Sequence, residues 1–419
     1  MKFSKYNIIV PAEQGNIIVY NTLSGAVIKI ASERYQENNI ILISKGMVVE
    51  DNVEELMIYK YKYEGLLYQT SDLDITIATT MNCNLRCPYC FEGDSKCSEY
   101  MTKDVANAII KYIIAKKQKK LNICWFGGEP LMNYEIIDYI SKQLIHNHIK
   151  FNATIVSNGT ILNKKIIQTI NSCKIRNMQI SLDGKRETHN TKRFFANKQG
   201  TYDLILENVT TLLDETQIQV FLKVNIDRNN MSEFRELYKA LNERFENYIL
   251  SGRLKIMTNY IRNKTNFSGC ESCIEETEYN KFRKKYFKER TLPQLATPCP
   301  IRCLSSLIFG PDGNIYKCLD LLGKIEKSIG NIKEFNISIS KQSNHALRFS
   351  PFENDECREC PVLPICGGGC PLEREQSILA NEKMQCPDVK YNIKQKVMEV
   401  YASLSSKKIK NTYSIKVSF

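Results

Sequence analysis

Three cysteines early in the chain have a spacing that can hold a metal cluster. Cys83, Cys87 and Cys90 follow a C-x3-C-x2-C pattern on one short segment. Three thiolates so placed can bind three irons of a cubane [4Fe–4S] cluster and leave the fourth iron without a protein ligand. That open iron can chelate a small molecule. Short cysteine spacings are also typical of zinc sites, so a zinc knuckle is the alternative for the triplet taken alone.

A turn after a predicted strand carries a second candidate site. Gly127, Gly128, Glu129 and Pro130 follow the strand expected at Leu121–Phe126. The two glycines can let the backbone approach a ligand closely, and the Glu129 carboxylate can accept hydrogen bonds from an ammonium group. Alone, the segment reads as a turn with an exposed glutamate. Because it follows a cysteine triplet on the preceding strand, we favour ligand binding.

Cysteines become dense again between residues 270 and 390, which hold ten of the sixteen. This zone shows weak periodicity and many glycines and prolines. A segment too rich in loops to bury much core usually needs metal to hold it together. The spaced cysteines are Cys299, Cys303, Cys318, Cys357, Cys360, Cys366, Cys370 and Cys386. Cys270 and Cys273 form a separate C-x2-C pair, for which we favour a reduced, flexible linker over a pair that contacts a peptide.

Elements that position the cysteine triplet are expected between residues 71 and 260. Runs typical of strands alternate there with segments of helical apolar spacing. Six such units imply a parallel sheet, open or barrel-like, in which chemistry occurs at the carboxyl ends of strands. The triplet follows the first of these strands. The predicted strands are Asp74–Thr79, Leu121–Phe126, Asn152–Ser157, Asn177–Leu182, Gln217–Ile226 and Arg253–Asn259, and the predicted helices include Val105–Ile114, Tyr134–Ile145, Leu204–Leu213 and Phe234–Leu241.

Composition limits the classes of partner and the compartment. The formal net charge is +12, but residues 1–70 carry seven basic against eight acidic residues, and the basic residues elsewhere are mostly dispersed. Binding to nucleic acid is therefore not expected. The sequence has no signal-like leader and no apolar run of membrane-spanning length. Clustered cysteines in a reducing compartment indicate metal rather than disulfides, so we expect a cytoplasmic protein without membrane contact.

The triplet loop and the turn at 127–130 together resemble the radical S-adenosylmethionine (SAM) superfamily. Further matches are Ser157–Thr160, Ser181–Gly184, His189, Asn190, Arg193 and Gly200–Tyr202. The resemblance covers residues 71 to about 260. It implies a partial barrel of six βα units that binds SAM through the open iron, generates a 5′-deoxyadenosyl radical and abstracts hydrogen from an unactivated carbon. It also implies a low-oxygen host and an electron donor such as flavodoxin or ferredoxin.

The same resemblance assigns roles to residues around the cofactor. Glu129 would hold the amino group of SAM, with Gly127 and Gly128 beside it. Ser181 and Arg193 would contact the carboxylate or ribose. Asn158 would belong to the same cofactor site. The alternative for Ser181 and Arg193 is that neither residue binds the cofactor. Ser181 would then be only a hydroxyl at the end of a strand, and Arg193 only a cation on the surface.

The later cysteines resemble the SPASM domain, which carries two auxiliary [4Fe–4S] clusters. The match runs from about residue 299 to 390. The family's interleaved ligation would place one cluster on Cys299, Cys303, Cys318 and Cys370, and the other on Cys357, Cys360, Cys366 and Cys386. Three [4Fe–4S] clusters are then expected in total, with zinc in one auxiliary site as the alternative. Asp320, close to Cys318, would take a proton from a substrate.

Residues 1–70 contain no cysteine and are predicted to form a small α+β module. Short strands are expected at Tyr6–Val10, Asn16–Tyr20 and Gly25–Ile30. The module resembles the leader-binding element of enzymes that mature ribosomally made peptides, and it would capture a leader by adding a strand to its sheet. A structural extension of the barrel is the alternative. The predicted division is therefore a leader-recognition module at 1–70, the barrel at 71–268, the SPASM domain at 269–390, and a helix and tail at 391–419.

These expectations combine into a radical SAM peptide maturase. The substrate would be a short precursor peptide with a leader, and the product a thioether from a cysteine sulfur to a carbon. An auxiliary cluster would take the surplus electron. The alternatives are an anaerobic sulfatase-maturing enzyme that makes formylglycine, an enzyme that forms carbon–carbon cross-links, and a non-catalytic iron–sulfur electron carrier.

Overall fold

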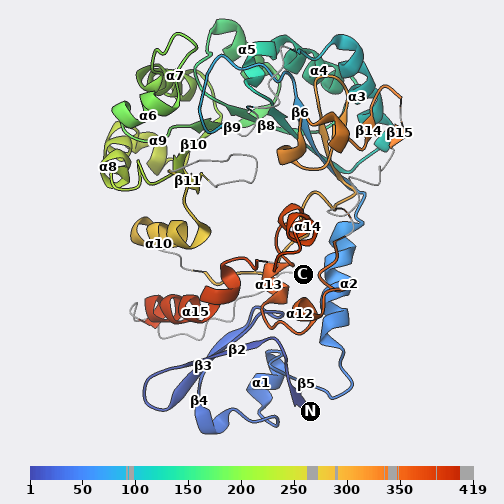
Figure 1. The fold of residues 1–419 in the computed structure, drawn as a ribbon, viewed down its shortest axis with the longest axis vertical. Coiled ribbons are helices and arrows are strands. Elements are labelled where there is room, and N and C mark those ends of the chain that lie inside the picture. The colour runs from blue at the N-terminus through green and yellow to red at the C-terminus, as the bar shows by residue number, and fades with distance from the viewer. Residues whose placement is uncertain are drawn as a thin grey trace. The chain divides into compact units, whose positions relative to one another are not determined.

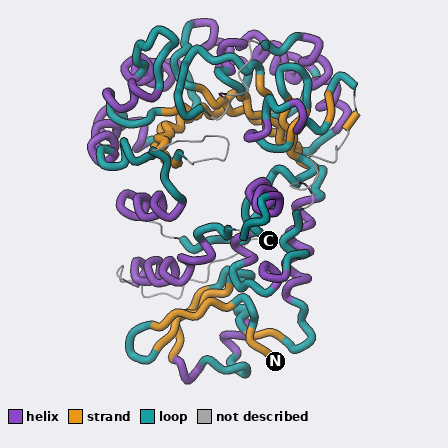
Figure 2. The backbone as a smooth tube through the Cα atoms, viewed as in Figure 1, coloured by secondary structure: helices purple, strands orange, loops and turns teal. Residues whose placement is uncertain are grey.

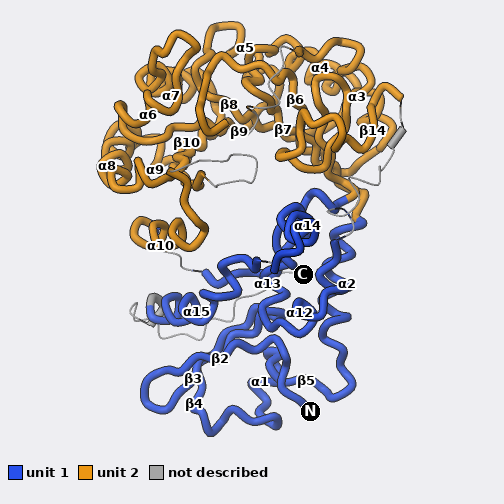
Figure 3. Tube along the Cα trace, viewed as in Figure 1, with its two compact units in different colours: residues 1–68, 287–303, 345–419 blue, residues 69–286, 304–344 orange. Residues whose placement is uncertain are grey.

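The chain divides into two compact units in the computed structural model. The described residues are 1–90, 93, 99–261, 272–287, 291–334, 336–337, 347, 349–383 and 385–405. Unit 1 comprises residues 1–68, 287–303 and 345–419, and unit 2 comprises residues 69–286 and 304–344 (Figure 3). Each unit therefore combines segments that are distant in sequence. No helix in the described ranges is both long enough and apolar enough to cross a membrane.

Unit 2 is built around a parallel sheet. Six strands lie in the order β11-β10-β9-β8-β7-β6, and every neighbouring pair is parallel. This arrangement confirms the predicted α/β class with a parallel-sheet core. The strands are β6 (Asp72–Ala78), β7 (Lys120–Phe126), β8 (Asn152–Ser157), β9 (Ile175–Ser181), β10 (Gln219–Ile226) and β11 (Leu254–Tyr260).

Helices cover one face of this curved sheet (Figures 1 and 2). Strand side chains alternate between the two faces, so that Val220, Leu222 and Val224 of β10 are fully buried, whereas Lys223 and Asn225 on the other face are partly exposed. That opposite face is therefore the more polar one. The helices of unit 2 are α3 (Lys103–Lys116), α4 (Tyr134–His146), α5 (Lys164–Ser172), α6 (Arg186–Lys192), α7 (Tyr202–Glu215), α8 (Phe234–Arg244), α9 (Glu246–Leu250) and α10 (Glu276–Tyr286), of which α10 lies apart from the covering layer (Figure 1).

A hairpin from a later part of the chain extends the sheet. Strand β12 (Ser306–Phe309) pairs in parallel with β6, and β13 (Ile315–Tyr316) pairs antiparallel with β12. The hairpin packs through Ile308 and Tyr316 against Met81 and Phe126. Residues predicted to form one SPASM segment at 269–390 are therefore shared between the two compact units. The four-part division by function stays a prediction, because compactness divides the chain differently.

Unit 1 contains the N-terminal module. Strands β2 (Asn7–Pro11), β3 (Asn16–Asn21) and β4 (Val27–Ala31) form an antiparallel sheet in that order, close to the predicted strand positions. Strand β1 (Lys2–Phe3) pairs with β5 (Val48–Val49). Helix α1 (Ile40–Ser44) begins at Asn39, whose side chain accepts hydrogen bonds from the first turn. A longer helix, α2 (Glu55–Leu67), follows.

The N-terminal sheet shares its core with the later cysteine-rich segment. Ile8, Val10, Ile18 and Tyr20 belong to one buried cluster with Val362, Ile365, Ile393 and Val397. The helices of that segment are α12 (Asp355–Arg358), α13 (Leu363–Cys366), α14 (Pro371–Leu379) and α15 (Val389–Ser405). The remaining short elements are the 3-10 turns η1 (Ser32–Arg34), η3 (Pro130–Asn133), η4 (Leu319–Leu321) and η5 (Ile325–Lys327) and the strand pair β14 (Gly330–Asn331) and β15 (Asn336–Ile337).

Candidate active site and cluster sites

The cysteine triplet lies on the loop that follows β6, at the carboxyl end of the sheet. Cys83 is buried, and Cys87 and Cys90 are partly exposed. The Cys83 Sγ accepts a hydrogen bond from the backbone N of Leu85 at 3.4 Å and another from Asn158 Nδ2 at 3.7 Å. These donors fix the first thiol before any metal binds. The triplet thus lies at the edge of the sheet where the sequence placed the chemistry.

A buried arginine faces all three thiols. Arg193 is 8% exposed. Burial lowers the pKa of its guanidinium, but the negative charges of Cys87, Asp183, Cys83 and Cys90 outweigh burial, so the net shift is upward. Its Nε has no hydrogen-bond partner within the part of the chain that the structure describes. A cation with an unused buried donor beside three thiols fits an anionic iron–sulfur group.

Arg193 is also tied to the loop through Tyr89 and Asp183. Arg193 Nη1 donates to the Tyr89 hydroxyl at 2.9 Å and lies 3.6 Å from Asp183 Oδ2. The Tyr89 hydroxyl donates to Asp183, whose other oxygen accepts from the backbone N and the side-chain amide of Asn225 at 3.2 and 2.9 Å. Burial raises the pKa of Asp183, while Arg193 and Asn225 oppose that shift. This network holds the cysteine loop against β9 and β10.

Glu129 lies inside the fold with its oxygens already engaged. It is fully buried, and Oε1 accepts from Ser157 Oγ at 2.9 Å and from the backbone N of Leu131 at 3.1 Å. Its Oε2 accepts from the backbone N of Asn158 at 2.7 Å. Burial raises the pKa of this carboxyl, and these three hydrogen bonds oppose the shift. The alternative of a turn with an exposed glutamate is therefore wrong, and Glu129 connects the turns after β7 and β8.

Asn158 connects this carboxylate to the cysteine loop. Its backbone N donates to Glu129, while its side-chain Nδ2 donates to Asn84 Oδ1 at 2.8 Å and to Cys83 Sγ. Glu129 and Cys83 are thus linked through one asparagine. The predicted cofactor residues Glu129 and Asn158 are brought together with the triplet, and their contact with SAM stays a prediction.

Gly127 and Gly128 are required by the chain's own backbone. A Cβ on Gly127, which has a φ of +126°, would lie 2.1 Å from the carbonyl oxygen of Thr80. A Cβ on Gly128 would lie 2.4 Å from the carbonyl oxygen of Asn82. These glycines let the turn approach the segment that leads into Cys83. Close approach to a ligand is not needed to explain them.

Ser181 lies at the end of β9, in register with Lys223 of β10. Lys223 was not recognised from the sequence as a site residue. Burial lowers its pKa, Asp183 opposes that shift and Arg193 adds to it. The signal that could have found it is a lysine within a predicted strand whose flanking residues Leu222 and Val224 are apolar. Ser181 and Lys223 together make this end of the sheet polar.

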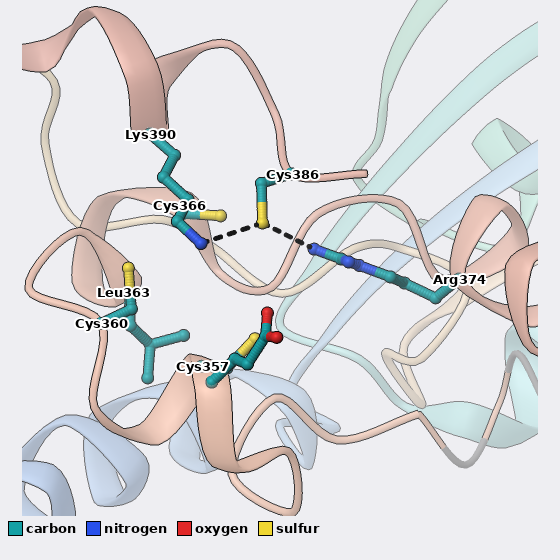
Figure 4. A pocket seen from close by; sticks show the side chains of 8 residues that line it. Cys357, Cys360, Leu363, Cys366, Arg374, Cys386 and Lys390 are labelled. Atoms are coloured by element: carbon teal, nitrogen blue, oxygen red, sulfur yellow. Dashed lines mark hydrogen bonds between the residues drawn. The ribbon is translucent and has the colours of Figure 1, made fainter. Parts of the chain in front are cut away.

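Four later cysteines line one pocket in unit 1 (Figure 4). Lys390 Nζ and Arg374 Nη2 donate to Cys386 Sγ at 3.4 and 3.8 Å. Burial raises the pKa of the Cys386 thiol, but the two donors outweigh it and the net shift is downward. The sequence did not point to Arg374 or Lys390. The cysteines of the pocket are those predicted for the second auxiliary cluster: Cys357, Cys360, Cys366 and Cys386.

The residues predicted for the first auxiliary cluster are distributed over both units. In unit 1, Cys299 lies near Cys370 and Cys303, whose charges raise its pKa in addition to the larger effect of burial. Cys318 and Asp320 belong to unit 2, where Asp320 lies in η4. Within unit 1 the structure brings three of the four predicted ligands together. The complete ligand set and the proton-transfer role of Asp320 stay predictions.

One further prediction concerns two cysteines outside these groups, the C-x2-C pair Cys270 and Cys273. Cys270 lies outside the described residues. Cys273 is disulfide-bonded, so the expectation of a reduced pair is wrong for this residue. A separate question is whether side chains gather around a single metal ion. In the described ranges, no three His, Cys, Asp or Glu side chains are close enough together to hold one.

Comparison with known proteins finds a family model that matches the middle of the chain. Residues 77–241 match the model of the radical SAM superfamily. The cysteine-type anaerobic sulfatase-maturating enzyme of Clostridium novyi is 25% identical over 344 residues, which cover 74% of this chain and 91% of that enzyme. The serine-type anaerobic sulfatase-maturating enzyme of Klebsiella aerogenes is 22% identical over 69% of this chain and 77% of its own length.

Solved structures share the fold. The anaerobic sulfatase-maturating enzyme anSMEcpe with bound AdoMet matches with a TM-score of 0.62 and 17% identity, covering 80% of this chain and all of that chain. SuiB of Streptococcus suis matches with a TM-score of 0.54 and 15% identity, covering 88% of this chain and 95% of that chain. SuiB bound to its precursor peptide SuiA matches with a TM-score of 0.50 and 16% identity, covering 93% and 99%.

Proposed function

Because residues 77–241 form a radical SAM domain, we propose that this enzyme modifies a ribosomally made precursor peptide and joins a cysteine sulfur to a carbon of the peptide. When bound, a [4Fe–4S] cluster with an open iron supplies one electron to SAM, whose cleavage gives the radical that removes a hydrogen atom from the substrate. Cys83, Cys87 and Cys90 would hold this cluster.

The chain's own residues prepare that site. Arg193 places a buried positive charge beside the three thiols, which favours their anionic form. Asp183 holds both Arg193 and Tyr89, so the loop between Cys87 and Cys90 is fixed from outside the loop. The polar sheet end formed by Ser181 and Lys223 would orient the carboxylate of SAM or a polar group of the peptide.

The feature that carries the peptide part of the proposal is the outer strand of the N-terminal sheet. Among the described residues, β4 pairs only with β3. Asn21 N donates to Ala26 O and Ser32 N donates to Gly15 O, so Ala26 and Ser32 are hydrogen-bonded positions on the β4 side of the β3–β4 pair. The amides of Val27, Lys29 and Ala31 must then point away from β3, because bonded and non-bonded positions alternate in antiparallel pairs. A leader peptide could pair with this edge as an added strand.

The named relatives favour one other reaction. Five of the relatives are sulfatase-maturating enzymes, and solved structures of anSMEcpe contain bound peptides. Formation of formylglycine is therefore the second candidate. In the thioether reaction, the carbon loses one hydrogen atom, the thiol loses its proton and one electron leaves to an acceptor. The peptide loses two hydrogens and keeps its sulfur, whereas formylglycine formation from a cysteine removes the sulfur, and from a serine it leaves every cysteine thiol free to be alkylated.

The test is the mass of the product. The reconstituted enzyme is incubated anaerobically with SAM, a reductant and each small cysteine-containing peptide encoded beside its gene, and a sulfatase peptide serves as the alternative substrate. A peptide that loses two hydrogens and resists thiol alkylation supports the thioether. If only the sulfatase peptide reacts, and it loses sulfur, the thioether proposal is wrong and formylglycine formation replaces it. The triple variant Cys83/Cys87/Cys90→Ala should give neither product.

A further inference from the structure

The four-thiol pocket of unit 1 contains two cationic side chains for which the proposed chemistry has given no role. Arg374 and Lys390 line the pocket and converge on the same sulfur, that of Cys386, from α14 and α15 (Figure 4). Glu356, the carboxylate that also lines the pocket, is exposed to solvent. The buried part of the pocket therefore has a positive charge opposite four thiols.

Arg374 is held in place by the loop that carries the cysteines. It is 2% exposed, and its Nε donates to the carbonyl oxygen of Gly368 at 3.0 Å. Gly368 has a φ of +90°, and a Cβ there would lie 2.7 Å from Pro351 Cβ. Only glycine suits this position. The Gly368 carbonyl is thereby fixed, and it orients the guanidinium toward Cys386.

One N–H donor group of Arg374, Nη1, has no hydrogen-bond acceptor among the residues that the structure describes. Nη2 donates to Cys386 Sγ, but Nη1 is buried without a hydrogen-bond partner in the described residues. A buried, unpaired donor on a charged group destabilises the folded protein, because it has lost its hydrogen bonds to water without replacement. An anionic acceptor in the pocket would remove that destabilisation. A [4Fe–4S] cluster on four thiolates is such an anion, and one-electron reduction makes it more negative.

We propose that Arg374 and Lys390 raise the reduction potential of an iron–sulfur cluster bound by the four thiols of this pocket. This inference rests on the proposed function only in assuming that the pocket holds an auxiliary cluster. The positive charges and the donors to Cys386 Sγ stabilise the more negative, reduced cluster more than the oxidised one. Nη1 of Arg374 supplies an additional donor to the cluster. The couple involves one electron, supplied in the measurement by dithionite through redox mediators.

The main test uses Lys390 and a matched control on the same helix. Lys390→Met removes one charge and one donor to Cys386. Lys394→Met removes the same charge from an exposed position that does not line the pocket. In reconstituted full-length protein, EPR-monitored redox titration should show that Lys390→Met makes reduction of one cluster about tenfold less favourable, a shift of about 59 mV to lower potential. Lys394→Met should leave every midpoint potential unchanged.

Arg374 variants separate charge from hydrogen-bond geometry. Arg374→Lys keeps the charge but loses the planar fork, so its midpoint potential should fall by less than that of Arg374→Met. If Arg374→Met does not fold, the comparison of Lys390→Met with Lys394→Met still tests whether the pocket cations raise the reduction potential. Unchanged potentials in both Lys390→Met and Arg374→Lys, with full iron content, would refute the tuning role. Zinc in place of iron at this pocket would instead overturn the cluster assignment, and failure of peptide modification with normal clusters and potentials would overturn only the proposed function.

Discussion

At the scale of single residues, Glu129 shows how burial changes what a substitution tests. Its carboxylate accepts three hydrogen bonds from the chain. Glu129→Gln replaces one acceptor oxygen with an amide that faces a donor, so at least one buried donor loses its partner. We expect a loss of about 1–3 kcal/mol in the free energy of unfolding, measured by urea denaturation of the apoprotein. Unchanged stability with weaker SAM binding would contradict this structural role and support direct contact of Glu129 with SAM.

His189 predicts a pH dependence of stability. Its Nδ1 accepts from the backbone N of Asp183, so its Nε2 carries the proton and donates to Thr201. Burial lowers the pKa of His189 to about 3, and Arg193 and Lys192 add to that shift. The unfolded chain therefore binds a proton below about pH 6.5 that the folded chain binds only near pH 3.

Stability should consequently fall as the pH decreases from about 6.5 toward 3, by at most about 1.4 kcal/mol per pH unit for this one group. His189→Gln cannot titrate and should reduce the slope of unfolding free energy against pH in that window. Exposed His146 offers the matched control, because His146→Gln should leave the slope unchanged. Equal slopes in wild type and His189→Gln would show that His189 is not buried as a neutral ring.

Some site residues could be identified from sequence and others could not. The triplet and the residues Glu129, Asn158 and Arg193 belong to local motifs whose spacing is visible in one dimension. Their partners are not visible, because Glu129 meets Asn158 only when β7 and β8 lie side by side. The glycines at 127 and 128 illustrate the difference: a turn was predictable, but its close contact with Thr80 and Asn82 depends on sheet register.

At the scale of elements, alternation and helical spacing located the strands and helices of the parallel sheet to within a few residues. Strand β8 has the predicted bounds Asn152–Ser157. Helix α2 was missed because it buries Tyr59, Tyr63 and Leu67 while exposing Met57, so its apolar residues do not form one clear stripe. Strand β12 was missed because its pairing with β6 joins segments more than two hundred residues apart in sequence.

The edge of β4 allows a selective test of leader binding. Lys29→Pro removes an outward N–H, and proline is tolerated on edge strands, so the β3–β4 ladder should survive. Lys29→Ala removes the side-chain charge but keeps the N–H. We expect Lys29→Pro to weaken binding of the leader-bearing peptide at least tenfold, measured by fluorescence anisotropy, with Lys29→Ala close to wild type. Equal affinities for both variants would exclude pairing at this edge.

At the scale of the whole molecule, removing the N-terminal module is not a clean alternative to that point variant. Ile8 and Val10 share a buried cluster with Ile393 and Val397. Deletion of residues 1–70 would expose this core and disturb the four-thiol pocket, whose Leu363 packs against Tyr59 and Tyr63. Loss of peptide modification in such a truncation would therefore not isolate leader recognition.

Iron content tests the number of clusters in the intact chain. With three clusters, anaerobically reconstituted protein should bind about twelve irons, and Cys83/Cys87/Cys90→Ala should bind about eight. Cys124→Ala and Cys173→Ala change cysteines outside the predicted cluster sites and should keep the full content. Iron and zinc are measured together by mass spectrometry. About eight irons in the wild type, or zinc in one site, would remove one auxiliary cluster from the proposal.

The discontinuity of unit 1 has a consequence for biogenesis. Its N-terminal sheet is synthesised first, yet its apolar face is covered by α15, which leaves the ribosome only after the whole radical SAM domain has emerged. Contacts of such long sequence separation form slowly, and the uncovered face can aggregate in the meantime. Cys386 and Lys390 also arrive late, so the four-thiol pocket does not exist on the nascent chain. A cluster held by these four thiols would therefore be inserted only after Cys386 has been synthesised, that is, after translation of nearly the whole chain.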